Sequence, residues 1–156
     1  MEAKAKLFGH SIHQMLIVFP LGLLGTGVVF DIVHFIVPQQ VFAAVAYWMM
    51  VAGIVGGVIA APFGLADWIS IPSGTRAKRV GAAHGIGNVV VLALFVASVL
   101  LRAGDDNPPP SLAYVCSFLG LLVALVTGWL GGELVARHGV GVHADAGLDA
   151  PRLRPH

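Results

Sequence analysis

The sequence predicts an all-α fold: a four-helix transmembrane bundle with up-down-up-down topology and both termini in the cytoplasm. Three observations predict it. The composition is too apolar for a soluble domain, four segments are long enough to cross a bilayer, and the basic residues gather on one side of them. Of the 156 residues, 57% are hydrophobic and 11% are charged, and the mean hydropathy is +0.86. Soluble domains carry about 25% charged residues, so we expect lipid to cover most of this surface.

Four apolar segments set the number of spans, because a helix needs about 20 mostly apolar residues to cross a hydrocarbon core of about 30 Å. These segments are 15–37, 42–65, 80–101 and 112–134. Turn-forming residues separate them: Pro38 after the first span, residues 72–74 between the second and third, and residues 108–110 before the fourth. We therefore expect one membrane domain over residues 8–142 and a poorly ordered cytoplasmic tail over residues 143–156.

The basic residues predict the orientation of the bundle. Eight of them fall on the N-terminal side of the spans: Lys4, Lys6, Arg76, Lys78, Arg79, Arg137, Arg152 and Arg154. Only Arg102 falls on the other side. Because Lys and Arg are retained on the cytoplasmic side, both termini are expected there, which requires an even number of spans. The net charge of +1 gives no indication of a nucleic-acid partner, and the single cysteine, Cys116, excludes an intramolecular disulfide.

Ionisable residues at the ends of the spans are the candidate functional groups, because such groups are costly near lipid and mark sites by default. Six of them lie at the predicted cytoplasmic face: His10, His13, Asp67, His84, Glu133 and His138. Each helix therefore brings a potential ligand or acid/base group to one face. At the opposite face only Asp31 and His34 stand out, one helical turn apart. We expect these two to form a hydrogen-bonded pair facing the interior, with a second, outer site as the alternative.

The first interpretation of the cytoplasmic group is a b-type haem. In an up-and-down bundle the first and third helices lie diagonally across the core, so His13 and His84 would meet there at similar depth. Two neutral imidazoles can take both axial positions of a haem, and Arg76 and Arg79 are placed to pair with its propionates. Glycines of the third span would leave room for the flat ring: Gly81, Gly85 and Gly87.

Two other interpretations compete with haem. In the second, a zinc or iron ion is held by some of the same six residues, since imidazole with carboxylate suits both metals. An open coordination position would then permit a metal-dependent membrane enzyme. In the third, the residues only join helix ends, as Glu133 and Arg137 can at i and i+4, in a cofactor-free structural or assembly subunit. All three remain open, and we favour a protein without independent catalytic activity.

Three sequence boxes carry a resemblance to a known family. Residues 9–22 read GHSIHQMLIVFPLG, residues 64–68 read GLADW, and residues 128–142 contain GWLGGEL followed by RHGVGV. These boxes resemble those of a family of small bacterial membrane proteins of unknown function, over nearly the whole chain. The family usually shows proline where Ser11 and Gln14 stand, so the first helix is expected to enter the membrane with a different bend.

The resemblance implies four helices in a bacterial inner membrane and singles out the same six candidate residues. Some relatives are joined to Rieske-type iron–sulfur domains, which suggests electron transfer and favours haem over a bare metal ion. The partners expected are therefore the lipid bilayer and a redox partner protein or larger membrane complex. A homo-oligomer stays open, and fusion to another domain does not by itself establish function.

Overall fold

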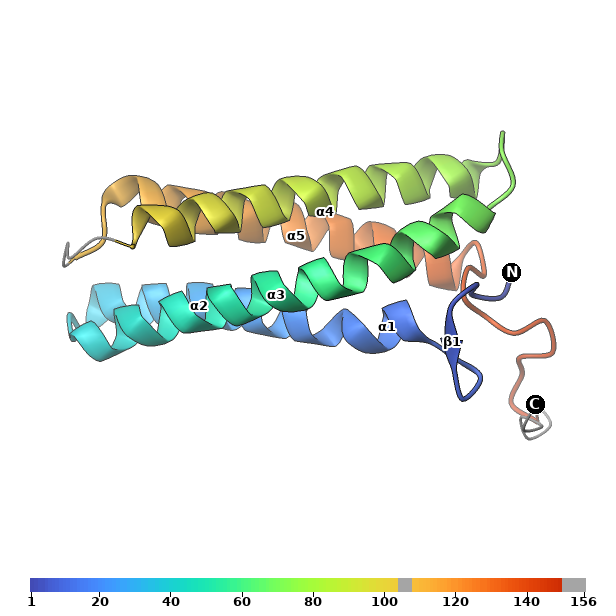
Figure 1. Ribbon diagram of the computed structural model, residues 1–156, viewed down its shortest axis with the longest axis horizontal. Coiled ribbons are helices and arrows are strands. Elements are labelled where there is room, and N and C mark those ends of the chain that lie inside the picture. The colour runs from blue at the N-terminus through green and yellow to red at the C-terminus, as the bar shows by residue number, and fades with distance from the viewer. Residues whose placement is uncertain (104–107, 150–156) are drawn as a thin grey trace.

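The computed structural model describes residues 1–103 and 108–149, and four long helices dominate it (Figure 1). They are α2 (Val18–Ile36), α3 (Gln40–Ser70), α4 (Arg76–Leu101) and α5 (Ser111–Ala136). Each is long and apolar enough to cross a membrane once the short helix α1 (Ile12–Leu16) is counted with α2. The predicted four-helix transmembrane fold is therefore confirmed. Figure 1 shows two hairpins, α2 with α3 and α4 with α5, and the N-terminal segment at the same end of the bundle as the connection from α3 to α4.

The helices extend beyond the predicted spans mainly at the end that holds the N-terminal segment. Helix α3 continues to Ser70 although Pro62 lies inside it, and α4 begins at Arg76 instead of residue 80. The Thr75 side chain caps α4 by accepting a hydrogen bond from the Lys78 N–H at 3.1 Å. Hydropathy detects only the apolar part of a helix, so the turns that contain polar residues, at the end of α3 and the start of α4, were missed.

A small β-hairpin precedes the bundle, where the sequence suggested only an approach to the first helix. Strand β1 (Lys6–Leu7) pairs antiparallel with β2 (His10–Ser11). The two turn residues between the strands, Phe8 and Gly9, have φ values of 48° and 83°. Positive φ at both central residues is the requirement of the type I′ turn, which favours glycine. The turn leaves Phe8 89% exposed.

The core lies between the two hairpins and is made of apolar side chains from all four long helices: Leu24, Val28, Ala46, Met50, Val91, Phe95 and Ala124. Large apolar side chains also cover the outside of the bundle. On α5, for example, Leu122, Leu125 and Trp129 are each about 60% exposed or more. Apolar surface of this extent is unfavourable in water and is typical of a membrane contact. The exposed faces therefore fit a bundle surrounded by lipid.

Candidate functional site

His84 on α4 has a hydrogen-bond partner at each of its ring nitrogens, and the Nδ1 bond reaches α5. Its Nδ1 donates a hydrogen bond to the carbonyl oxygen of Thr127 at 2.8 Å. A neutral imidazole that donates from Nδ1 accepts at Nε2, and the amide Nδ2 of Asn88 lies 3.1 Å from that Nε2. The Thr127 hydroxyl in turn donates to Asn88 Oδ1 at 3.1 Å. Three side chains and one backbone carbonyl thus form a closed network between the two helices.

His13 makes a similar contact between α1 and α3. Its Nδ1 lies 3.0 Å from the carbonyl oxygen of Ala60. The imidazole packs directly against Gly64, where an added Cβ would stand 2.6 Å from His13 Cε1. A larger residue at position 64 would therefore displace the ring. The first candidate histidine is thus held by the neighbouring helix of its own hairpin, as His84 is.

Asp67, near the end of α3, binds the backbone of the N-terminal segment. Its side chain is buried, and Oδ1 accepts hydrogen bonds from the N–H of Lys4 at 2.6 Å and of Ala5 at 3.4 Å. Hydrogen bonds from N–H groups to a carboxylate are shorter and stronger than those between neutral groups. The contact fixes the segment that leads into β1 against the end of the bundle.

The remaining predicted residues of this face do not converge on those three. Glu133 forms the expected ion pair with Arg137, with Oε1 3.0 Å from Nη1. His10 lies exposed on β2, and the two arginines assigned to the haem propionates, Arg76 and Arg79, lie near the start of α4. The Nε2 atom of His138 is buried without a hydrogen-bond partner in the described part of the chain.

The segment after α5 also contributes to this face, although no sequence pattern pointed to such a contact. The backbone N–H of Gly141 donates to the Met1 carbonyl at 2.8 Å. The His143 ring nitrogens lie 2.9 Å from the Gly9 carbonyl oxygen and 3.3 Å from Glu2 Oε1. His143, to which no role was assigned, therefore joins the segment after α5 to the N-terminal hairpin. The predicted poorly ordered tail includes residues 150–156, which lie outside the described residues.

Contacts within the chain occupy part of the space and one of the donor atoms that the haem interpretation requires. His84 Nε2 already accepts from Asn88. Of the glycines expected to make room for the ring, Gly81 is covered by Trp68, whose Cδ1 would be 2.8 Å from an added Cβ, and Gly87 is covered by the methyl group of Thr127. Among residues 1–103 and 108–149, no three His, Cys, Asp or Glu side chains are grouped so that they could hold a metal ion. The haem, zinc and iron assignments stay predictions.

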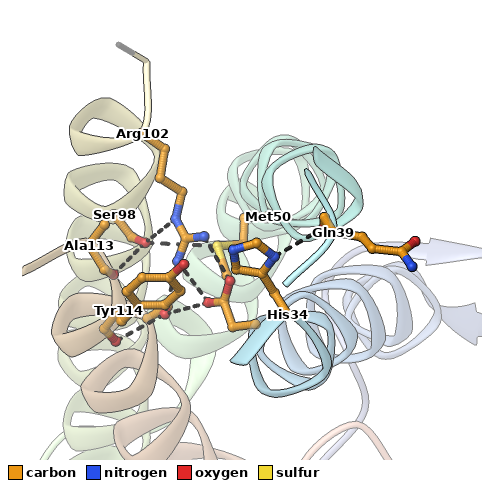
Figure 2. Close-up of polar contacts among 9 residues, drawn as sticks. His34, Gln39, Met50, Ser98, Arg102, Ala113 and Tyr114 are labelled. Carbon is orange, nitrogen blue, oxygen red and sulfur yellow. Dashed lines mark hydrogen bonds and ion pairs between the residues drawn. The ribbon is translucent and has the colours of Figure 1, made fainter. Parts of the chain in front are cut away.

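A buried ion pair lies at the opposite end of the bundle and joins the two hairpins. Arg102, just after α4, binds Asp31 of α2 with two parallel bonds, Nη1 to Oδ1 and Nη2 to Oδ2, each 2.7 Å long. The two side chains are only 2% and 0% exposed. The expected hydrogen bond between Asp31 and His34 does not form. His34 Nδ1 instead lies 3.0 Å from the carbonyl oxygen of Gln39, as Figure 2 shows.

Serine hydroxyls complete the environment of this ion pair. Ser117 donates to Asp31 Oδ2 at 3.0 Å, and Ser98 accepts from Arg102 Nε at 3.2 Å. In Figure 2, Arg102 and Ser98 extend from the end of α4 toward Tyr114, and the guanidinium lies 4.9 Å from the centre of the Tyr114 ring. A buried ion pair needs such additional hydrogen bonds to offset the loss of hydration. In the sequence, Arg102 stood out only as a lone basic residue.

A cavity of about 410 Å³ lies beside this ion pair. It is bounded by the turn after α2 and the start of α5, with the following lining residues: His34, Phe35, Pro38, Pro108, Pro109, Ser111 and Tyr114. The lining is mostly apolar. It offers His34 and Tyr114 as its largest polar groups.

Comparison with known proteins adds one match. The model of a family described as predicted membrane protein (DUF2231) matches residues 9–144. The match runs from the turn of the N-terminal β-hairpin to the segment that follows α5. No curated protein and no solved structure matches the chain.

Proposed function

The chain belongs to the DUF2231 family of predicted membrane proteins, and from this premise we propose that it is a structural subunit of a bacterial inner-membrane complex, without catalytic activity of its own. One observation carries the proposal. Three of the candidates at the end of the bundle that holds the N-terminal segment, called the inner end, use their polar atoms to join parts of the chain to one another: His13, Asp67 and His84. A catalytic group directs a donor or acceptor into a cleft where a substrate can reach it.

The proposed orientation places both chain ends in the cytoplasm. The N-terminal segment and the connection from α3 to α4 lie at the same end of the bundle (Figure 1), so Lys4, Lys6, Arg76 and Arg79 gather there. This distribution of basic residues supports a cytoplasmic location for that end.

Reporter fusions test the orientation. Fusions after residue 143 and within residues 72–74 should report the cytoplasm, while fusions at Pro38 and Pro109 should report the periplasm. The orientation is wrong if the fusions after residue 143 and at Pro109 report the same side.

Haem-dependent electron transfer is the second candidate, and one specific observation favours it. Both His13 and His84 can donate Nδ1–H to a backbone carbonyl, which leaves Nε2 with the lone pair. Histidines that ligate metals are oriented by a second-nitrogen bond of this kind. Against it stands the Asn88 amide at His84 Nε2, which would have to turn away.

One purification decides between the candidates. The full-length protein, extracted from bacterial membranes in mild detergent, is analysed by oxidised and reduced visible spectra and by elemental analysis. The structural role predicts a colourless protein without stoichiometric iron or zinc. A low-spin haem spectrum that is lost in both His13→Ala and His84→Ala would establish the haem and overturn the structural proposal. Stoichiometric zinc or iron in a colourless protein would establish the metal site instead.

A further inference from the structure

The two hairpins repeat the same histidine contact. In the first hairpin the Nδ1 of His13 bonds the backbone carbonyl of Ala60 at 3.0 Å, and in the second the Nδ1 of His84 bonds that of Thr127 at 2.8 Å. The number of residues from His13 to His84 relates the first helices of the two hairpins, and we call it the first-helix offset. The number of residues from Ala60 to Thr127 relates their second helices, and we call it the second-helix offset.

The same histidines also face equivalent glycines. The ring of His13 packs on Gly64, and the ring of His84 packs on Gly131, where added Cβ atoms would stand 2.6 Å and 3.1 Å from Cε1. Gly64 follows Ala60 by one turn, as Gly131 follows Thr127, so the second-helix offset is kept. A histidine bonded to one carbonyl and stacked on the glycine one turn later therefore occurs twice.

A further contact in the middle of each hairpin obeys the same two offsets. In the first hairpin Leu24 fills the space beside Gly53, and in the second Phe95 fills the space beside Gly120, with added Cβ atoms 2.7 Å and 2.8 Å from the side chain. Leu24 and Phe95 are separated by the first-helix offset, and the two glycines by the second-helix offset. Ordinary helix packing brings apolar residues and glycines together, but it does not set one register along the whole length of both hairpins.

The last contact lies near the end of the bundle that holds Asp31 and Arg102, called the outer end. An added Cβ at Gly27 would stand 3.3 Å from the Ala46 carbonyl oxygen. At the equivalent place, again by both offsets, the Ser98 hydroxyl donates to the Ala113 carbonyl at 2.7 Å. Four separate contacts thus agree on one alignment of the hairpins.

From this agreement we infer that the chain is a tandem repeat of one two-helix unit, and that the ion pair of Asp31 with Arg102 holds its two copies together. Asp31 and Arg102 are separated by the first-helix offset as well, so they occupy the same position in the two copies. These two residues touch each other. Equivalent positions that touch lie on the axis relating the copies. Since the two hairpins run in the same direction (Figure 1), that axis runs along the bundle.

The charges on the axis decide which copies can pair. In a pair of identical units the residue at this position meets its own copy, and two aspartates or two arginines would repel each other in a buried contact. One aspartate and one arginine attract only when a first unit meets a second unit. The residues around the ion pair also differ between the two copies. The second copy has Ser98 and Ser117 at the positions where the first copy has Gly27 and Met50.

The inference is tested by exchanging the two copies' residues within the full-length chain. The single variants are Asp31→Arg and Arg102→Asp, and the double variant carries both changes. A mirrored variant adds Gly27→Ser, Met50→Ser, Ser98→Gly and Ser117→Met to the double variant. A control carries those four changes without the charge exchange. Each protein is fused to a fluorescent reporter, extracted in detergent and heated, and the melting temperature and oligomeric state are read by size-exclusion chromatography.

Each single variant should melt at least about 10 °C below the unchanged protein or fail to accumulate, because breaking a buried ion pair leaves one charge uncompensated. The double variant should recover half or more of that loss, and the mirrored variant should recover more than the double variant. The control should be less stable than the mirrored variant. If the double and mirrored variants are no more stable or abundant than the single ones, the positions are not equivalent and the inference is overturned. Single variants with the same melting temperature as the unchanged protein would show that the ion pair does not hold the two copies together.

Discussion

Replacing Asp67 with alanine should release the N-terminal segment from the bundle without unfolding the helices. Asp67 is 8% exposed, and one of its carboxylate oxygens accepts from the backbone N–H of Lys4 at 2.6 Å and of Ala5 at 3.4 Å. Removing it leaves both N–H groups without this acceptor, while the contacts within α3 are unchanged. The effect is therefore expected at the segment and not in the core.

The size of the effect follows from these two contacts. A hydrogen bond to a charged group contributes about 1.5–3 kcal/mol, and the contact at 3.4 Å adds little because hydrogen bonds weaken with length. A total of about 2–3 kcal/mol corresponds to a roughly 30- to 140-fold larger fraction of molecules with the segment released.

Trypsin cleavage after Lys4 and Lys6, followed by intact mass spectrometry, measures that fraction. When opening and closing are fast, the cleavage rate follows the population of the open form, so Asp67→Ala should be cleaved tens of times faster than the unchanged protein. Asp67→Asn keeps an acceptor oxygen but loses the charge, and it should lie between the two. Equal cleavage rates in the alanine variant and the unchanged protein would refute the assignment of Asp67 to this contact.

Three further predictions concern the same end of the molecule. Lys78→Met removes an ammonium that donates to the last carbonyls of α3 at 2.7 Å and 3.3 Å, and should lower the melting temperature by about 2–6 °C. Gly131→Leu should lower it more, since a Cβ there meets an imidazole at 3.1 Å, whereas Gly132→Leu, with nothing within 4 Å, should leave it unchanged; equal effects would contradict the packing. The hydrogen bond from Lys6 is the main cause that lowers the pKa of Glu2 below 4.5. The contact is therefore stabilising above that pH and is lost as the pH falls through the lowered pKa, which hydrogen exchange of the N-terminal peptide should show as faster exchange in acid.

The number and order of the helices could be predicted because they depend on composition and length alone. The ends could not, because the last turns of α3 and the first turn of α4 are polar and are fixed by particular contacts. The hydroxyl of Thr75 at the start of α4 is one example. A Ser/Thr before a run of helix formers is a signal that a search for caps could have used.

His13 and His84 were located on the correct helices, but their partners were not foreseeable. The partners of His13 and His84 are backbone carbonyl oxygens of neighbouring helices, and every residue has such an oxygen. Which carbonyl is used depends on the rotation of each helix about its axis, and an apolar sequence surrounded by lipid indicates that rotation only weakly.

The ion pair at the outer end was missed for a different reason. Arg102 follows the last residue of α4 and was counted only for the orientation of the bundle, while the nearest sequence neighbour of Asp31 with a polar side chain is His34. The first-helix offset was the available signal, because it relates Asp31 to Arg102 as it relates His13 to His84. A search for internal repeats before assigning residue pairs would have found it.

The melting temperature of His84→Ala tests the central claim most directly, which is that the inner-end polar residues stabilise helix packing. The change removes the bond to the Thr127 carbonyl and leaves the Asn88 amide without its imidazole partner. A lost bond and an unsatisfied amide together cost about 2–4 kcal/mol. The account predicts a fall of roughly 4–15 °C in purified full-length protein, with or without a chelator, and no change for the exposed His10→Ala. A His84→Ala protein with the same melting temperature as the unchanged protein would contradict the account.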